Sequence, residues 1–255
     1  MTEVTVATLN LFNKVGRWGE RQQLVVQQLA ALQPDVIGLQ EVDLIIDQAM
    51  AICRLVNSHV GEGPRYRVYH MGRTGRSAHV QALAVMTRLP VVAHEGLDYV
   101  LRDGVAQRLR VQLDGGATLD FYNTHLWFPP DGQQDRLAQA KKLLAWSDTW
   151  PDAGATVIGG DFNAYPDEPT VALMKERFAS AHEAANGSEP ESTWPTPVNT
   201  FDPSPPGCLD YLFVRGARVV EAGLCFNTPH LIDPDLYPSD HLGVMARLDI
   251  DASAG

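Results

Sequence analysis

Cysteine is scarce in this sequence, and its scarcity excludes a fold that disulfide bonds hold together. The three cysteines, Cys53, Cys208 and Cys225, are far apart and show no CxxC spacing, which is typical of proteins in a reducing compartment. A chain of 255 residues can bury enough apolar surface to fold without such cross-links. We therefore predict a single domain over residues 1–255 and a cytoplasmic location.

Long apolar segments are also missing. Residues 1–10 enter an alternating apolar run directly, without the basic segment and apolar core of a signal peptide. No stretch has the roughly 20 consecutive apolar residues that a membrane-spanning helix needs. We expect no integral membrane contact.

Basic residues are outnumbered by acidic ones. The chain has 20 Lys and Arg against 31 Asp and Glu, which gives a formal net charge of −11. Proteins that bind nucleic acid backbones usually have a basic patch and a basic pI. The acidic balance therefore weighs against a polynucleotide partner.

Apolar periodicity, in contrast, is strong. Hydrophobic residues make up 45% of the chain, and the first 60 residues follow a strand, helix, strand, helix pattern over 3–10, 19–32, 35–40 and 44–60. Strand-like runs then dominate up to residue 124, which favours antiparallel pairing. They cover 65–70, 80–87, 91–100, 107–113 and 118–124, before a helix at 132–150, a strand at 155–159, a helix at 169–178 and strands near Tyr211, Val219 and Val244.

These patterns predict mixed sheets within one layered domain of the α/β (α+β) class. Residues 187–207 are rich in Ser and Pro, and we interpret them as a long surface loop.

Polar side chains recur where the apolar strands stop, and ligands bind at strand ends in open α/β sheets. Taken singly, each has an ordinary alternative: a turn amide, a solvated or hydrogen-bonded acid, or a packed histidine. The residues are Asn10, Glu41, His125, Asp161 with Asn163, Asp210, and Asp240 with His241.

Two of these fragments are the most specific. In Gly160–Asn163 the glycine allows a close backbone approach, and the acid and the amide can share one side of a turn. In Ser239–His241 the acid and the imidazole are adjacent, so they can serve one site only if the backbone turns there.

Together, over Thr8 to Gly243, the fragments resemble the endonuclease/exonuclease/phosphatase superfamily, which includes pancreatic-type deoxyribonuclease and bacterial sphingomyelinases. The resemblance implies a four-layer sandwich, in which two packed mixed β-sheets are flanked by helices. It also implies a divalent-metal-dependent hydrolase of phosphate esters, a phosphodiesterase or phosphatase.

By this resemblance, Glu41 is the principal Mg²⁺ ligand, with contributions from Asn10 and Asp240, and Mn²⁺ is expected to substitute. Asp161 would activate the attacking water, and Asn163 would fix its carboxylate. His125 and His241 would donate hydrogen bonds to the phosphoryl oxygens. Asp210 would hold His241 and keep it cationic.

The same resemblance suggests surfaces that face the substrate. Arginine binds phosphate and aromatic rings stack on bases or pack on lipid tails; the candidates are Arg73, Arg76, Trp127 and Trp194, with a solvated turn or core packing as the alternatives.

Three functions compete. Because the chain is acidic, we expect a small molecule or a lipid headgroup to be favoured over nucleic acid as the phosphate-ester substrate. An endo- or exonuclease is the alternative, and salt dependence separates the two. A catalytically silent binding module is a third possibility, since a fold alone does not establish activity.

Overall fold

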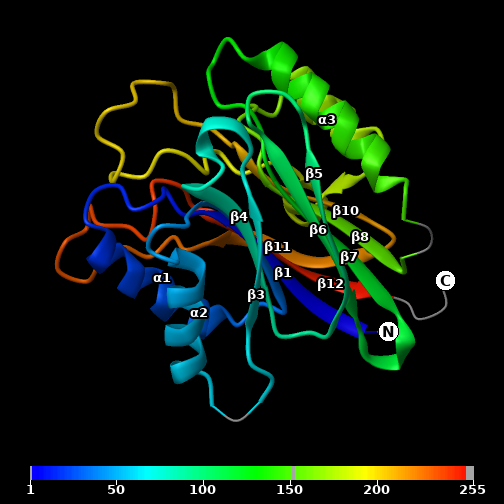
Figure 1. Cartoon of the computed structure of the whole chain (residues 1–255), viewed down its shortest axis with the longest axis horizontal. Coiled ribbons are helices and arrows are strands. Elements are labelled where there is room, and N and C mark those ends of the chain that lie inside the picture. The colour runs from blue at the N-terminus through cyan, green and yellow to red at the C-terminus, as the bar shows by residue number, and fades with distance from the viewer. Residues whose placement is uncertain (1, 62, 151–152, 251–255) are drawn as a thin grey trace.

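The computed structural model describes residues 2–61, 63–150 and 153–250, and it contains two six-stranded sheets with helices on their outer faces. In Figure 1, α1 (Trp18–Leu32) and α2 (Gln48–His59) lie on one side of the strands, and α3 (Gln133–Ser147) lies on the other. The predicted four-layer sandwich of two mixed sheets is therefore confirmed.

The first sheet has the strand order β11-β12-β1-β2-β4-β3. Strands β1 and β2 are parallel and the other neighbours are antiparallel. Its strands are β1 (Thr2–Asn10), β2 (Val36–Asp43), β3 (Arg67–Gly72), β4 (Gln81–Thr87), β11 (Arg218–Cys225) and β12 (Gly243–Ile250).

The second sheet has the strand order β5-β6-β7-β8-β10-β9. Here β7 and β8 are parallel, so each sheet holds one parallel pair near its centre. Its strands are β5 (Val91–Asp98), β6 (Val105–Gln112), β7 (Thr118–His125), β8 (Ala155–Asp161), β9 (Ala179–Ser180) and β10 (Asp210–Arg215).

Three apolar cores separate the layers, and β1 shows how the sequence builds them. Val4 and Val6 face the core between the two sheets, whereas Ala7 and Leu9 face the core under α1 and α2. A third core, which includes Tyr122 on β7, lies between the second sheet and the helices α3 and α4 (Pro169–Lys175). Strands buried on both faces are apolar at nearly every position, which explains the continuous runs in the sequence.

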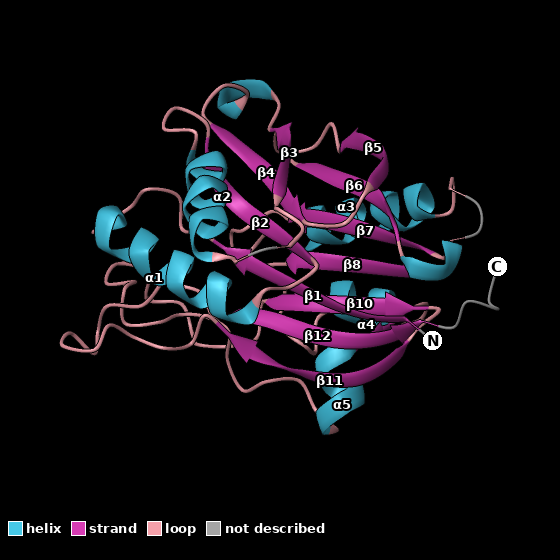
Figure 2. Cartoon of the chain, turned by 90° about the horizontal axis from the view of Figure 1, so that it is seen from below, coloured by secondary structure: helices cyan, strands magenta, loops and turns pink. Residues whose placement is uncertain are grey.

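The structure adds two short elements that the periodicity did not predict. Strand β9 and helix α5 (Ala181–Asn186) follow α4 directly, and α5 lies beside β11 (Figure 2). Elements this short leave too few residues for a periodic pattern.

The loop over residues 187–207 is only partly at the surface. Trp194 is buried and forms an isolated bridge with Gly207, and the hydroxyl of Thr193 accepts a hydrogen bond from the amide of Leu209. The base of the loop is therefore fixed to the sheet, while Phe201 farther along it is 66% exposed. Among the helices of the described segments, none has the length and apolar character to cross a membrane.

Candidate active site

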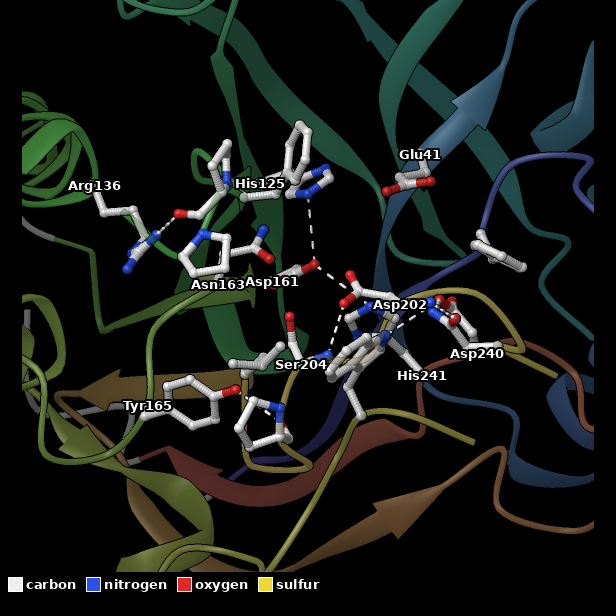
Figure 3. A pocket seen from close by; sticks show the side chains of 18 of the residues that line it. Glu41, His125, Arg136, Asp161, Asn163, Tyr165, Asp202, Ser204, Asp240 and His241 are labelled. Carbon is white, nitrogen blue, oxygen red and sulfur yellow. Dashed lines mark hydrogen bonds and ion pairs between the residues drawn. The ribbon is translucent and has the colours of Figure 1, made fainter. Parts of the chain in front are cut away.

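The strand-end polar residues converge at one edge of the sandwich. Asn10 ends β1 and Glu41 lies within β2, both in the first sheet. From the second sheet, His125 ends β7, Asp161 ends β8 and Asp210 begins β10. The segment before β12 completes the group with Asp240 and His241, and Figure 3 shows the labelled members around one cavity.

Glu41 reaches this edge through an irregularity in its strand. The register between β2 and β4 shifts between Leu39 and Val42, and Glu41 has a left-handed backbone with φ 52°. A β-bulge re-aims a side chain, and a non-glycine residue in this region stores strain of about 1–3 kcal/mol. The position of this carboxylate therefore lowers the stability of the fold.

Gly160 brings the neighbouring strand close enough to position Asp161. Its φ is 145°, and a Cβ atom built there would lie 2.0 Å from the carbonyl oxygen of Thr124 on β7. Only glycine fits such an approach. Beyond the strand, Asn163 is also left-handed at φ 49°, its amide donates to Asp161 Oδ1 at 2.9 Å, and its side chain donates to the carbonyl of Leu126 at 3.1 Å.

Asp161 is the centre of the site. Its Oδ2 accepts a hydrogen bond from Asn10 Nδ2 at 2.9 Å, and it lies 3.5 Å from His125 Nε2 and 3.8 Å from His241 Nε2. Burial raises the pKa of Asp161 to about 7, with nearby Asp210 adding to the shift and His241 opposing it. A carboxylate with a pKa near neutrality is suited to accept a proton from water.

His241 is held as a cation. Its Nδ1 donates to Asp210 Oδ2 at 2.8 Å, and the same oxygen accepts the hydroxyl of Thr193 at 2.7 Å. Burial alone would lower the pKa of His241, but the charges of Asp210, Asp240 and Asp161 raise it well above its ordinary value. Both ring nitrogens then carry protons, so Nε2 is a donor that faces Asp161.

His125 is held as a neutral imidazole. Burial, together with the charges of Arg73 and His241, lowers its pKa well below the ordinary value. Arg73 Nη2 lies 2.9 Å from His125 Nδ1, and because a guanidinium can only donate, Nδ1 must be the acceptor. This contact leaves the proton on Nε2, so His125 and His241 present the same donor atom to Asp161 in different charge states.

Asp240 is oriented by residues of the 187–207 loop. Its Oδ2 accepts hydrogen bonds from Trp194 Nε1 at 3.3 Å and Asn199 Nδ2 at 3.0 Å. The adjacent Ser239 donates to the carbonyl of Asn10 at 2.6 Å, which ties this segment to the end of β1. The backbone therefore turns at Ser239–His241, as a shared site requires.

The donor set fits a hard divalent cation. Burial and the negative charge of Asp240 raise the pKa of Glu41, so the two carboxylates repel each other and a cation between them would relieve that repulsion. Asn10 Nδ2 donates to Asp161 and, at 3.5 Å, to Glu41, and the role of Asn10 as a metal ligand stays a prediction. A second group, Asp161, Asp210 and His241, has ligand atoms within 4.8 Å of one another, but a protonated His241 cannot coordinate a metal.

A cavity of about 440 Å³ opens over these groups. Of the substrate contacts predicted from the sequence, Trp194 lines it and Arg73 contacts His125 beneath it. Arg76 is exposed on its loop, and Trp127 packs beside Phe128 and Arg102. Among the described residues, neither Arg76 nor Trp127 lines the cavity.

Aromatic side chains form another part of the cavity lining, and sequence reasoning did not predict Phe12, Phe201 or Tyr165 as substrate contacts. The rings of Phe12 and Phe201 stack at 5.8 Å between centroids with an interplanar angle of 20°. Phe128 and Tyr165 also line the cavity. These residues lie in separate loops without a shared motif, and Phe12 is buried, so no local pattern in the sequence marks them as one group.

Similar proteins point to a substrate class that composition did not predict. Nocturnin of Xenopus laevis is 29% identical over 262 residues, covering 90% of this chain and 64% of that protein. Carbon catabolite repressor protein 4 homolog 3 of Arabidopsis thaliana is 26% identical over 195 residues, 71% of this chain and 41% of that protein. The chain thus spans between about two fifths and two thirds of the length of these relatives.

The structure of D. rerio TDP2 complexed with a single-strand DNA product has a TM-score of 0.79 and 18% identity, covering 98% of this chain and 100% of that one. The expectation that a small molecule or a lipid headgroup is favoured over nucleic acid is therefore contradicted. That expectation rested on the net charge, which is a sum over the whole chain. The sum also includes the negative charges of carboxylates that are suited to hold a cation. Local chemistry decides what a cavity binds.

Membership of a family rests on the match to a family model. The model of the Endonuclease/Exonuclease/phosphatase family matches residues 7–241, from the middle of β1 to His241, and includes every strand-end residue described above. With most of the chain matched and the same layered fold in the solved structures, the protein belongs to the endonuclease/exonuclease/phosphatase family.

Proposed function

We propose that the protein is a Mg²⁺-dependent phosphodiesterase that hydrolyses single-stranded nucleic acid, with Mn²⁺ as a substitute ion. The observation that carries the proposal is a cavity whose lining combines polar and aromatic groups. Glu41, Asp161 and His241 supply polar groups, and the stacked Phe12 and Phe201 supply aromatic rings. A phosphodiester needs the polar groups, and an unpaired base stacks on an aromatic ring.

Each polar residue has a separate part in this mechanism. Glu41 and Asp240 would hold the cation, which when bound polarises the phosphoryl oxygen and stabilises the leaving oxygen. Asp161 accepts the proton of the attacking water, and its pKa near 7 suits that transfer. Asn163 orients this carboxylate through its backbone amide.

The two histidines bind the phosphoryl group through their Nε2 protons. His241 brings a positive charge that Asp210 maintains, and His125 brings a neutral donor whose tautomer Arg73 fixes. Donors preorganised in this way contribute about 10²- to 10³-fold each to the rate. The charge of Arg73 lies directly behind His125, where it also attracts the phosphate.

A cytoplasmic location remains part of the proposal. Its support is that Cys53, Cys208 and Cys225 are buried free thiols.

The test compares substrates and one matched variant. Short single-stranded DNA and RNA, a duplex, bis(p-nitrophenyl) phosphate and p-nitrophenyl phosphate are incubated with Mg²⁺ or with chelator, using the wild type and Asp161→Asn. We expect metal-dependent cleavage of single strands that the variant loses. Failure to cleave any oligonucleotide, or a preference for the phenyl esters, would contradict the proposal.

A further inference from the structure

Arg21 is a fully buried cation that no step of the proposed mechanism uses. It lies in α1, and its exposed fraction is 0%. Within the described part of the chain, its guanidinium donates hydrogen bonds only to backbone carbonyl oxygens, at 2.8 to 3.3 Å. These carbonyls belong to Leu11, Phe12, Asn13, Val15 and Pro238.

Among the described residues, no carboxylate lies within ion-pair distance of Arg21. Arg136, another buried arginine, differs, because it pairs with Glu168 at 2.9 Å. Burial lowers the pKa of Arg21 to about 10, and the charges of Asp240 and Glu41 oppose this change. The guanidinium therefore remains charged at neutral pH, close to the carboxylates that would hold the cation.

The five carbonyls come from two segments that both carry site residues. The first segment follows Asn10 and contains two successive left-handed residues, Phe12 at φ 55° and Asn13 at φ 45°. The second segment ends at Pro238, directly before Ser239–His241. Residues other than glycine rarely adopt a left-handed backbone without support from their surroundings. Here the support is the Arg21 guanidinium, to which the carbonyls of both residues are hydrogen-bonded.

We propose that Arg21 is a positioning residue that sets the geometry of the metal-binding carboxylates. One planar group clamps the loop after β1 to the segment before β12. Because the Asn13 side chain in that loop donates to the backbone carbonyl of Glu41 at 3.4 Å, the clamp fixes where Glu41 and Asp240 lie relative to each other. Its charge also offsets the repulsion between them before a cation binds. The metal-binding part of this inference rests on the proposed function, whereas the clamp itself does not.

Two substitutions separate the geometry of the guanidinium from its charge. Arg21→Lys keeps the charge but cannot reach five carbonyls, and Arg21→Ala removes both. Arg108→Ala is the control for the loss of a buried arginine, because Arg108 donates to the backbone carbonyl of Trp146 and pairs with Glu95 but lies outside the site. Arg108→Ala is expected to lower the melting temperature without changing the site.

The first measurement is Mn²⁺ affinity by isothermal titration calorimetry without substrate. Residues that orient metal ligands cost about 10- to 100-fold in metal affinity when they are lost, and we expect this loss for Arg21→Ala and a smaller one for Arg21→Lys. Added guanidinium ion should restore part of the affinity and the turnover of Arg21→Ala, and the same concentration of sodium chloride should not. Wild-type Mn²⁺ affinity in both folded variants would overturn the proposal.

The second measurement is amide hydrogen exchange, which does not depend on activity. Exchange should rise together in residues 11–15 and 239–241 of Arg21→Lys and stay unchanged there in Arg108→Ala. If the wild type binds no Mn²⁺, the proposed function fails, while the exchange of these two segments still decides the clamp. Should Arg21→Ala not fold, Arg21→Lys decides both measurements, and unchanged exchange with unchanged affinity would refute the inference.

Discussion

The two sheets contribute unlike halves to one site. The first sheet and its loops bring Glu41 and Asp240, oxygen groups suited to hold a cation, and the second brings His125, Asp161 and Asp210, groups suited to move or hold protons. In the first half the pKa of Glu41 is raised by burial and by a second carboxylate. In the second half, the pKa of His125 is lowered by burial and an arginine. Neither half is complete without the other.

His241 joins the halves, and this teaches how the site depends on the packing of the two layers. Its backbone leads into β12 of the first sheet, while its Nδ1 donates to Asp210 on β10 of the second. Asn10 makes the reverse link, from β1 to Asp161 on β8. A small shift between the sheets would therefore alter both halves together.

Asp161→Asn should have the largest effect and should damage only the proton-handling half. The amide keeps the shape but cannot accept the proton, so we expect kcat to fall by about 10²- to 10⁴-fold. Calorimetry should give Mn²⁺ affinity close to that of the wild type. Loss of Mn²⁺ binding in this variant would instead identify Asp161, Asp210 and His241 as the metal ligands.

Glu41→Gln should damage the cation-binding half. A divalent cation stabilises the transition state by several kcal/mol. Because each 1.36 kcal/mol corresponds to a factor of ten in rate, we expect weakened cation binding to lower kcat/KM by about 10³-fold. Higher Mg²⁺ concentrations should restore part of the rate, since the other ligands remain. A rate that the added metal cannot change, with unaltered Mn²⁺ affinity, would exclude Glu41 as a ligand.

Asp210→Asn tests the link between the halves. In the wild type, His241 stays protonated through neutrality because the charges of three carboxylates outweigh its burial. Removing the charge of Asp210 therefore lowers the pKa of His241. We expect turnover to fall by about 10²-fold. As pH rises from 6 to 8, wild-type turnover should increase because Asp161 loses its proton, whereas the turnover of Asp210→Asn should fall behind because His241 loses its own proton. Asp120→Asn, a buried aspartate paired with Arg110, is the control. Parallel pH profiles for the wild type and Asp210→Asn would contradict the pairing.

Phe201→Ala should have the smallest effect and leave both halves intact. The ring is 66% exposed and stacks on Phe12, so its loss removes a base contact worth about 1–3 kcal/mol. For single-stranded oligonucleotides KM should rise about 10-fold with kcat unchanged, and bis(p-nitrophenyl) phosphate should be unaffected. Val100→Ala, at an exposed position that does not line the cavity, serves as the control. An equal loss for both substrates would show that Phe201 does not bind a base.

The amino-acid sequence predicted the strands and helices because their signals are local, whereas the resemblance to the family supplied the four-layer arrangement. Residues 2–10 of β1 alternate between two cores, and Gly160 and Asp161 follow an apolar run, so strand, turn and polar end can be recognised within a few residues. The roles of the strand-end residues remain predictions, although the structure places their side chains around one cavity.

What the sequence alone could not predict depends on neighbours that are distant along the chain. Whether a histidine is neutral or charged follows from Arg73 beside His125 and Asp210 beside His241, 52 and 31 residues away. The aromatic part of the cavity lining joins Phe12 to Phe201 from two loops. Electrostatic shifts and stacking act through space at a few ångströms, and only the packing of the two sheets brings these groups within that range.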